Sequence, residues 1–462
     1  MNRTSFRGLI TLAIGLSCMH LCSGLSQDST EMPSHLGFEH SKMQELVEIA
    51  GYPLEEHFVT TGDGYVLGLY RIPHGRDVVK LRAKNSFKKE NDDHKTNTAP
   101  PMPPPKAGPP VLLQHGLLDS SATFVVNFPH QSLGFILADH GYDVWLGNSR
   151  GNAFSRNHTG FQPTGPTSSF FWDFSFDDMA DYDIPAVVQY ILSNTDAKYT
   201  KLAYVGHSQG ATQAFAALSA KPALQQKIAA LIALAPAIFL RYTSSIPFLL
   251  LAQLHTDQMF DMLGQHEFLP ARKATADIFS AVCKTSPLAC TSILTAICGF
   301  NPHNLNVTRL PTYVAYAPSG TSVKNMAHWA QLIRQSGEER TSLFRRYDYG
   351  NTCFTTARTS PLENGLGSPR NCNKRIYNTD IPPSFNLSAL TDVPIAIFSG
   401  IQDILADPVD VEALVESLPP GALVYFQSEL SFEHIDFTWG LSSAEKIYPA
   451  VVRLLDQYLM EK

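Results

Sequence analysis

The chain has 462 residues, of which 44% are hydrophobic and 17% are charged. This composition predicts a globular protein with a large buried core and excludes a disordered or fibrous chain. Acidic residues outnumber basic ones and give a formal net charge of −7, so nucleic acid is not an expected partner.

The amino terminus is typical of a secretory signal. Arg3 and Arg7 precede an apolar stretch over residues 9–21, and small residues follow at 22–24. We therefore expect residues 1–24 to be a signal peptide and the protein to be exported. The apolar stretch is too short to span a bilayer, and no later run reaches about 18 apolar residues, so no transmembrane segment is expected.

The next segments predict a hairpin and a surface insertion. Residues 58–72 contain two strand-like pieces around the turn Thr61 to Gly64. Residues 78–110 turn from basic to acidic to proline-rich, which predicts a mobile insertion without catalytic residues.

From residue 111 onward, strand patterns alternate with helix patterns. The expected elements are a strand at 111–113, a helix at 132–140, a strand at 142–146, a helix at 184–192 and a strand at 201–205. This alternation predicts an α/β fold with a mostly parallel sheet covered by helices.

The last of these strands runs directly into Gly206-His207-Ser208-Gln209-Gly210, and a helix pattern follows. A serine between two glycines at a strand-to-helix turn is the pattern of a nucleophile elbow, because side chains at the glycine positions would collide with neighbouring backbone. The start of the helix favours negative charge beside the serine. We predict that Ser208 is a nucleophile for acyl transfer; an incidental glycine-rich turn is the alternative.

The alternation stops after residue 236, where residues 239–300 read as helical and apolar without recognisable strands, and it returns with a strand at 393–398. We therefore expect a cap or lid inserted into one sheet. Its apolar runs either bury against each other or form a lid that exposes part of them to lipid. The predicted division is a core of sheet and helices at 25–238 and 391–462 with the cap at 239–390.

An elbow serine needs a general base, and the base needs a carboxylate that orients it. In sheets of this kind the acid precedes the base in the chain. Asp403 lies in the loop after the strand at 393–398 and is the preferred acid. Asp407 is the rival, but it precedes Pro408 and a helical stretch, as an N-cap residue does.

His434 is the predicted base because it is the histidine that follows Asp403 and it lies beyond the next strand, at 423–426. We expect Asp436, two residues later, to tether this loop. Oxyanion donors are expected from the backbone N–H groups of Gln209 and Leu117.

His115 and His207 flank these donors, and we assign them a part in loop shape rather than in proton transfer. Removal of the signal leaves five cysteines in an oxidising compartment, and none has zinc-site spacing. We expect bridges between Cys283 and Cys290 and between Cys353 and Cys372, with Cys298 free, and no metal or other cofactor. Glycosylation sequons stand at Asn157, Asn306 and Asn386.

The sequence resembles the acid lipase family of gastric and lysosomal lipases, including insect relatives, from about residue 45 to 458. The segments that carry the resemblance are Gln114–Leu118, Gly141–Asn152, Tyr204–Gly210, Ala317–Val323, and Leu405–Pro408 with His434–Phe437. The resemblance implies an α/β-hydrolase with a helical cap and lid, the triad Ser208, Asp403 and His434, and oxyanion donors at Leu117 and Gln209.

The resemblance also implies a secreted or lysosomal enzyme that hydrolyses neutral lipid esters at an oil–water interface, often at acidic pH. The alternatives are a carboxylesterase for soluble esters and a lipid carrier without turnover. The chain departs from the family pattern in its longer 78–110 insertion, in an added segment at 353–372, and in the loop 399–403, which lacks a second glycine before the acid.

Overall fold

The computed structural model describes residues 35–76, 107–253, 264–270, 281–301, 303–339, 342–350 and 372–460. The chain divides into two compact units, residues 1–40 and 41–462. Within the first unit the described part is the beginning of helix α2 (His35–Ile49). The predicted signal peptide and most of the predicted insertion at 78–110 lie outside the described residues. All the described strands lie in the second unit.

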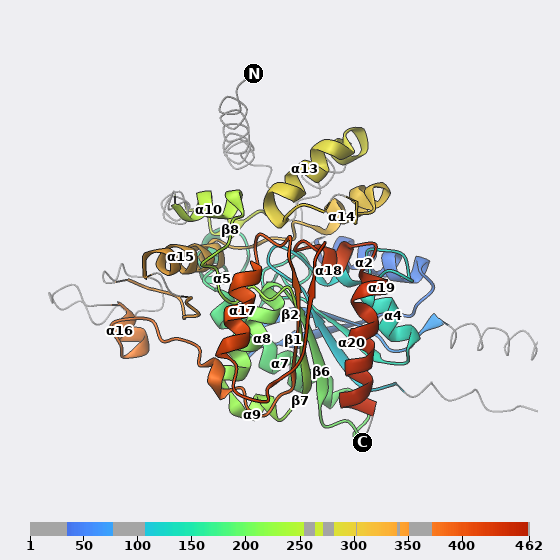
Figure 1. Cartoon of the computed structure of the whole chain (residues 1–462), viewed down its shortest axis with the longest axis horizontal. Helices are drawn as coiled ribbons and strands as arrows, with labels where there is room; N and C mark the ends of the chain where they lie inside the picture. Colours follow the sequence, from blue (N-terminus) through green and yellow to red (C-terminus); the bar gives the residue numbers. More distant parts are fainter. Residues whose placement is uncertain are drawn as a thin grey trace, which may run out of the picture. The chain divides into compact units, whose positions relative to one another are not determined.

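A mostly parallel sheet forms the centre of this unit (Figure 1). Its strands run in the order β1-β2-β4-β3-β6-β7-β10-β11, and β5 pairs with β2. Their bounds are β1 Glu55–Thr60, β2 Tyr65–Ile72, β3 Pro110–Gln114, β4 Asp143–Gly147, β5 Asn157–His158, β6 Leu202–His207, β7 Ile228–Leu234, β10 Ile395–Gly400 and β11 Leu423–Glu429. Pairing is parallel from β4 to β11 and antiparallel at the β1, β2 and β5 end, which confirms the predicted α/β class and the predicted hairpin.

Helices cover both faces of the sheet, with α7, α8 and α17 on one side and α4, α19 and α20 on the other (Figure 1). Every residue of β3, β6 and β7 is consequently buried, which explains why these strands read as continuous apolar runs rather than alternating ones. The core helices are α4 Leu133–Asp139, α5 Ser168–Phe171, α6 Phe176–Asp178, α7 Ile184–Ser193, α8 Gln209–Ala220, α9 Pro222–Gln225, α17 Pro408–Ser417, α18 Asp436–Trp439, α19 Ser443–Lys446 and α20 Tyr448–Leu455.

The chain leaves the sheet after β7 and returns at β10, which pairs directly with β7. We call residues 239–390, the predicted cap, the insert. Its described elements are α10 Ile246–Gln253, β8 Glu267–Phe268, α13 Pro287–Cys298, α14 Leu310–Tyr316, β9 Thr321–Ser322, α15 Val323–Glu339 and α16 Cys372–Tyr377. The expectation that residues 239–300 hold no strand is wrong, because β8 pairs with β9. Two residues are too few for a periodic sequence pattern to reveal a strand.

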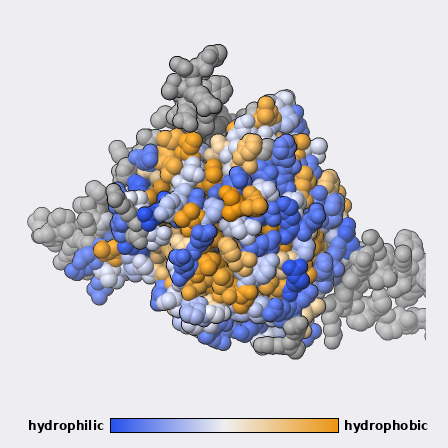
Figure 2. All heavy atoms as spheres, in the orientation of Figure 1, coloured by the Kyte–Doolittle hydropathy of each residue, from blue (hydrophilic) through white to orange (hydrophobic). Residues whose placement is uncertain are grey.

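Apolar side chains of the insert reach the surface. Hydrophobic residues gather over α10 in the space-filling view (Figure 2). Ile246 in α10, Leu288 in α13 and Phe300 just after α13 are 62%, 77% and 66% exposed. Helices α10 and α13 contact each other, so these side chains belong to neighbouring parts of the insert. Among the described residues, no helix combines the length and the apolar character needed to cross a membrane.

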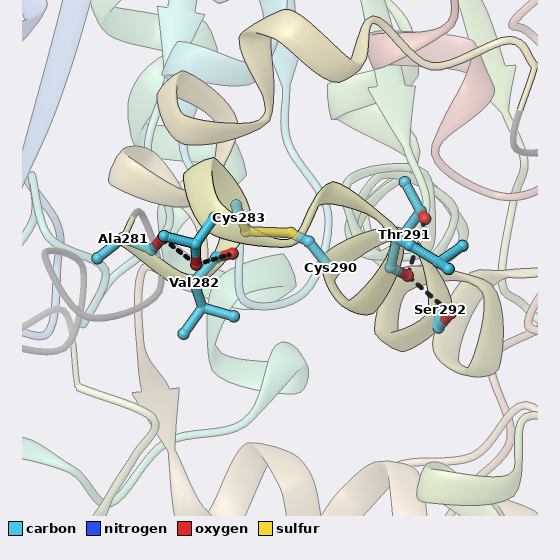
Figure 3. The surroundings of a disulfide bond; sticks show 8 residues. Ala281, Val282, Cys283, Cys290, Thr291 and Ser292 are labelled. Atoms are coloured by element: carbon cyan, nitrogen blue, oxygen red, sulfur yellow. Dashed lines mark hydrogen bonds between the residues drawn. A yellow bond between two sulfur atoms is a disulfide. The ribbon is translucent and has the colours of Figure 1, made fainter.

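A disulfide joins Cys283 to Cys290, as predicted (Figure 3). It connects the helical residues 281–285 to the first turn of α13. Cys298, at the end of the same helix, is a buried free thiol, which also agrees with the sequence-based expectation. Cys353, the expected partner of Cys372, lies outside the described residues, so that second bridge stays a prediction.

Candidate active site

Ser208 stands on a sharp turn between β6 and α8, with backbone angles φ 54° and ψ −123°. A residue other than glycine rarely adopts this backbone conformation, so the surrounding contacts must hold Ser208 in it. A Cβ at Gly206 would lie 2.6 Å from the backbone nitrogen of Ala211, and one at Gly210 would lie 2.3 Å from the carbonyl oxygen of Gln114. Both glycines are therefore required by backbone that passes too close for any side chain.

Three side chains form a hydrogen-bonded chain at this turn. His434 Nδ1 lies 2.7 Å from Asp403 Oδ2, and His434 Nε2 lies 2.7 Å from Ser208 Oγ. An ionised carboxylate can only accept, so Nδ1 carries the proton of the neutral imidazole and Nε2 accepts from the serine hydroxyl. The arrangement can therefore take the proton of Ser208 as its oxygen attacks an acyl carbon.

The two aspartates that the sequence offered as the acid occupy different positions. Asp403 Oδ1 accepts from the backbone N–H groups of Leu405 and Ala406, while its Oδ2 faces His434. Asp407 is the N-cap of α17 and accepts from the backbone N–H of Val409 at 2.9 Å. Asp407 is thus a helix cap, as its position before Pro408 predicts, and Asp403 is the aspartate that faces His434.

The candidate triad is almost closed to water. Ser208 is 7% exposed, His434 4% and Asp403 2%. The loop that carries the histidine is fixed by Asp436, whose Oδ2 accepts from the backbone N–H of Glu433 and from Asn301 Nδ2 of the insert. Asp436 thus tethers this loop, as the sequence suggested. Because few water dipoles screen the site, charge interactions in it are stronger than at the surface.

The loop after β3 passes directly beside the nucleophile. A Cβ at Gly116 would lie 2.9 Å from the Cβ of Ser208, so the backbone that leads to Leu117 is in contact with the serine. The next residue, Leu118, has φ 60°, and its carbonyl oxygen accepts from the backbone N–H of Ser319 at 2.7 Å. Gln209 begins α8, where the first N–H groups have no partner inside the helix. The backbones of Leu117 and Gln209 therefore flank the serine, as an oxyanion hole would require.

The two histidines near these donors, His115 and His207, form hydrogen bonds to backbone groups of the surrounding loops. His115 Nδ1 donates to the carbonyl oxygen of Gly116, and its Nε2 accepts from the backbone N–H of Ser149 at 3.1 Å. Burial lowers the pKa of His115 to about 4, so the ring is a neutral acceptor under mildly acidic conditions. His207 Nε2 donates to the backbone carbonyl oxygen of His434, which ties the elbow to the loop of the base.

The sequence reasoning missed the scaffold that holds the oxyanion loop. Ser149 Oγ accepts from the side-chain amide of Gln114 at 3.0 Å. Asn148 Oδ1 accepts from the backbone N–H of Ser121, on the far side of the same loop, and from Asn152 Nδ2. A run of buried polar residues directly after the apolar strand β4 was the available signal, since such residues require partners.

A buried cation lies within the same run. Arg150 is 1% exposed and donates to carboxylates from two separate parts of the core, Asp63 in the hairpin turn and Asp183 just before α7. Its guanidinium also lies 4.0 Å from the ring centroid of Tyr65. Arg150 therefore connects the hairpin turn to the segment before α7. Removing either carboxylate would leave its buried charge less well compensated.

The three sequons differ in their surroundings. Asn306 and Asn386 each cap a short helical turn, accepting from the backbone N–H and hydroxyl of the third sequon residue. Asn386 is exposed, whereas Asn157 in β5 and Asn306 are half-buried. Glycosylation at these positions stays a prediction.

The chain is similar to known proteins over nearly its full length. Residues 109–441 match the family described as alpha/beta hydrolase fold, and residues 43–128 match the partial alpha/beta-hydrolase lipase region. Lipase member K of Homo sapiens is 38% identical over 90% of this chain and 91% of that protein. Gastric triacylglycerol lipase of Mus musculus is 39% identical over 89% and 91%, and lysosomal acid lipase/cholesteryl ester hydrolase of Rattus norvegicus is 37% identical over 90% and 91%.

The sheet order, the elbow and the family match together define an α/β-hydrolase. Within that class, the similarity to the gastric and lysosomal enzymes covers about nine-tenths of the chain. The chain belongs to the acid lipase family.

Proposed function

We propose that this protein is a secreted or lysosomal serine lipase that hydrolyses neutral lipid esters at an oil–water interface. The observation that carries the proposal is the hydrogen-bonded chain from Asp403 through His434 to Ser208 at a strained elbow. The names of the relatives, triacylglycerol lipase and cholesteryl ester hydrolase, indicate triacylglycerol and sterol esters as the substrate class.

In the proposed reaction, Ser208 Oγ attacks the ester carbonyl carbon while His434 Nε2 takes the hydroxyl proton. Asp403 holds the ring and stabilises the imidazolium, and the backbone N–H groups of Leu117 and Gln209 bind the oxyanion. His434 then gives its proton to the departing alcohol, which leaves an acyl group on Ser208. Water, activated by the same histidine, releases the fatty acid and restores the serine.

The surface of the insert supports a lipid substrate over a small soluble one. Ile246, Leu288 and Phe300 are large apolar side chains that are each more than half exposed on or beside contacting helices. Apolar side chains that gather on one exposed surface, as they do over α10 in Figure 2, are typical of sites that bind lipid or another protein. A surface of this kind next to a closed triad fits an enzyme that works on an emulsion droplet.

Fatty-acid release tests the proposal. The purified protein is given emulsified long-chain triacylglycerol, a cholesteryl ester dispersion and a soluble short-chain ester, from acidic to neutral pH. Ser208→Ala is the critical variant, and Ser193→Ala, an exposed serine at the end of α7, is the matched control. We expect Ser208→Ala to lower kcat by about 10⁶-fold with an unchanged melting temperature, and the control to keep full activity.

The outcomes separate the candidate functions. Serine-dependent release from the emulsions supports the lipase. Release from the soluble ester alone would make the protein a carboxylesterase, and release from none of the three would favour a lipid carrier. Normal activity in Ser208→Ala would overturn the catalytic assignment.

A further inference from the structure

We propose that Asn325 and Trp329, on helix α15 of the insert, position the oxyanion donor Gln209 and thereby set the rate of acyl transfer. This inference rests on the proposed function, because it assigns a role to residues that contact the proposed oxyanion hole. Neither residue reaches Ser208, His434 or Asp403 in any described hydrogen bond, so both would act through Gln209.

The side chain of Gln209 is held at both of its polar atoms: its Nε2 donates to Met179 Sδ of the core at 3.7 Å, and its Oε1 is bound by the insert. Its Oε1 accepts from Asn325 Nδ2 at 2.9 Å and from Trp329 Nε1 at 2.7 Å. The donors are four residues apart and therefore lie on the same face of α15. Gln209 is 2% exposed, Asn325 0% and Trp329 4%, so water does not compete for these bonds. The residue directly after the nucleophile is thus anchored to the insert.

The segment that leads into α15 holds the other side of the same hole. The backbone N–H of Ser319 donates to the carbonyl oxygen of Leu118, the neighbour of the second proposed donor, at 2.7 Å. Ser319 also accepts, through its carbonyl oxygen, from the backbone N–H of Ala153. Residues 319–329 therefore contact both loops from which the oxyanion donors come.

Further contacts fix this segment in place. Ser322 Oγ donates to the carbonyl oxygen of Phe174 and accepts from the backbone N–H of Asn325. Asn325 Nδ2 also donates to Thr321 Oγ1, and the ring of Trp329 lies 5.1 Å from that of Phe176. Phe174 and Phe176 belong to the core rather than to the insert, so α15 is a rigid support between the core and Gln209.

The physical reason for a support lies in the elbow itself. An oxyanion donor is effective only when its N–H points at the place where negative charge develops, and losing one donor costs about 10²–10³ in kcat. The peptide between Ser208 and Gln209 follows a residue at φ 54°, a conformation that relaxes unless its neighbours prevent it. Two hydrogen bonds to the Gln209 side chain restrain the rotation of this peptide.

A purely structural role predicts different results. If these bonds only satisfied a buried amide, their loss would lower stability and leave the rate of the folded enzyme unchanged. If they position the donor, the loss appears in kcat with little change in KM, because the hole binds the oxyanion and not the ground-state ester.

The test uses Trp329→Phe, which removes the N–H donor and keeps an aromatic ring, and Gln209→Leu, which removes the acceptor and the contact with Met179 and keeps the backbone donor. Asn325→Leu and the pair Gln209→Leu with Trp329→Phe complete the series. Gln335→Ala is the control, since Gln335 is on the same helix and donates to Asp348 instead. For each, kcat and KM are measured on a soluble short-chain ester, together with the melting temperature and the rate at which a fluorophosphonate labels Ser208.

We expect Trp329→Phe and Gln209→Leu each to lower kcat about 10-fold to 100-fold, with KM within about threefold and slower labelling in proportion. The double variant should lose no more than Gln209→Leu alone, because Trp329→Phe removes a hydrogen bond that Gln209→Leu has already removed. The control should match the wild type in kcat.

Unchanged kcat and labelling rate in both single variants, with Ser208-dependent turnover in the wild type, would overturn the positioning role alone. Multiplied losses in the double variant would also overturn it, because the two residues would then act independently. A wild type without Ser208-dependent turnover or labelling would overturn the proposed function and this inference together.

Discussion

The backbone N–H of His434 donates to the carbonyl oxygen of Cys298 at 3.3 Å. Cys298 is the last residue of α13, and the same oxygen accepts from the backbone N–H of Ile404, the residue after Asp403. Gly299, the next residue of the insert, forms an antiparallel bridge with Asp403. The end of one insert helix therefore contacts both the loop of Asp403 and the loop of His434.

Gly299→Ala should disturb both loops at once. Gly299 has φ 130°, and a Cβ there would lie 2.2 Å from the carbonyl oxygen of Gln402 and 2.7 Å from the Cβ of Glu433. We expect kcat to fall at least about 10²-fold, because a displacement near 1 Å is enough for such a loss. Ester turnover and melting temperature of the purified variant measure this effect.

The control for this change is Gly165→Ala. Gly165 also has a positive φ, 78°, but a Cβ there meets no atom within 4 Å. It should show the backbone cost alone and keep its kcat. Equal activity in the two variants would mean that the end of α13 does not position the triad loops.

The two candidate acids can be separated by paired substitutions. Asp403→Asn should lower kcat about 10⁴-fold, because an amide opposite His434 Nδ1 favours the wrong tautomer of the ring. Asp407→Ala removes the N-cap of α17 and should cost about 1 kcal/mol of unfolding free energy. Its kcat on the soluble ester should stay within about twofold of the wild type. The reverse pattern would assign the acid to Asp407.

The elbow should not tolerate a methyl group at Gly210. The new Cβ would lie 2.3 Å from the backbone oxygen of Gln114, so the elbow or the oxyanion loop must move. We expect Gly210→Ala to lower the free energy of unfolding by roughly 3 kcal/mol and to abolish most turnover. Gly337→Ala, exposed in α15 with open space around it, should instead raise stability by up to about 1 kcal/mol. Chemical denaturation of both variants provides the comparison.

A buried pair outside the active site predicts a pH-dependent stability. Asp177 Oδ1 lies 3.9 Å from His328 Nδ1, and among the described residues neither atom has a hydrogen-bond partner. Burial raises the pKa of Asp177 to about 7 and lowers the pKa of His328 to about 3. His328 Nε2 donates to the carbonyl oxygen of Arg345, so its Nδ1 is an acceptor that a protonated Asp177 faces.

The folded pKa of Asp177 lies above its unfolded value of about 3.8. Its contribution to stability is therefore complete below about pH 4 and is lost as the pH rises through about 7, at most about 4 kcal/mol in total. Asp177→Asn mimics the protonated acid at every pH. Its melting temperature should fall less between pH 5 and pH 8 than that of the wild type. An equally steep fall would show that Asp177 does not titrate in this range.

The sequence was sufficient for those parts of the site that depend on local pattern and chain order. The elbow could be predicted because it needs two glycines at fixed spacing. Asp407 could be recognised as an N-cap because Pro408 follows it. His434 was found because it follows the next strand after Asp403, and parallel strands bring such loops to one edge of the sheet.

The contacts between the insert and the site could not be read in this way. Trp329 and Gln209 are 120 residues apart, and Asn301 and Asp436 are 135 apart. The packing of the whole insert decides how these segments lie relative to each other. Residue periodicity and spacing therefore cannot predict the hydrogen bonds between them. The same limit applies to Asp410 in the first turn of α17, which accepts from the backbone N–H of Tyr242, 168 residues away.

Helix α15 has a buried part around Asn325 and Trp329 and an exposed part near its carboxyl end, and substitutions in the two should have different effects. On the side of Asn325 and Trp329, a new side chain would change the hydrogen bonds to Gln209. At its exposed end, Gly337 and Glu338 face solvent, and a Cβ added at Gly337 has no atom within 4 Å. We therefore expect substitutions at the exposed positions to be tolerated and substitutions at Asn325 or Trp329 to be costly. Chimeras that exchange whole inserts between relatives should accordingly fail more often than those that exchange only the outward residues.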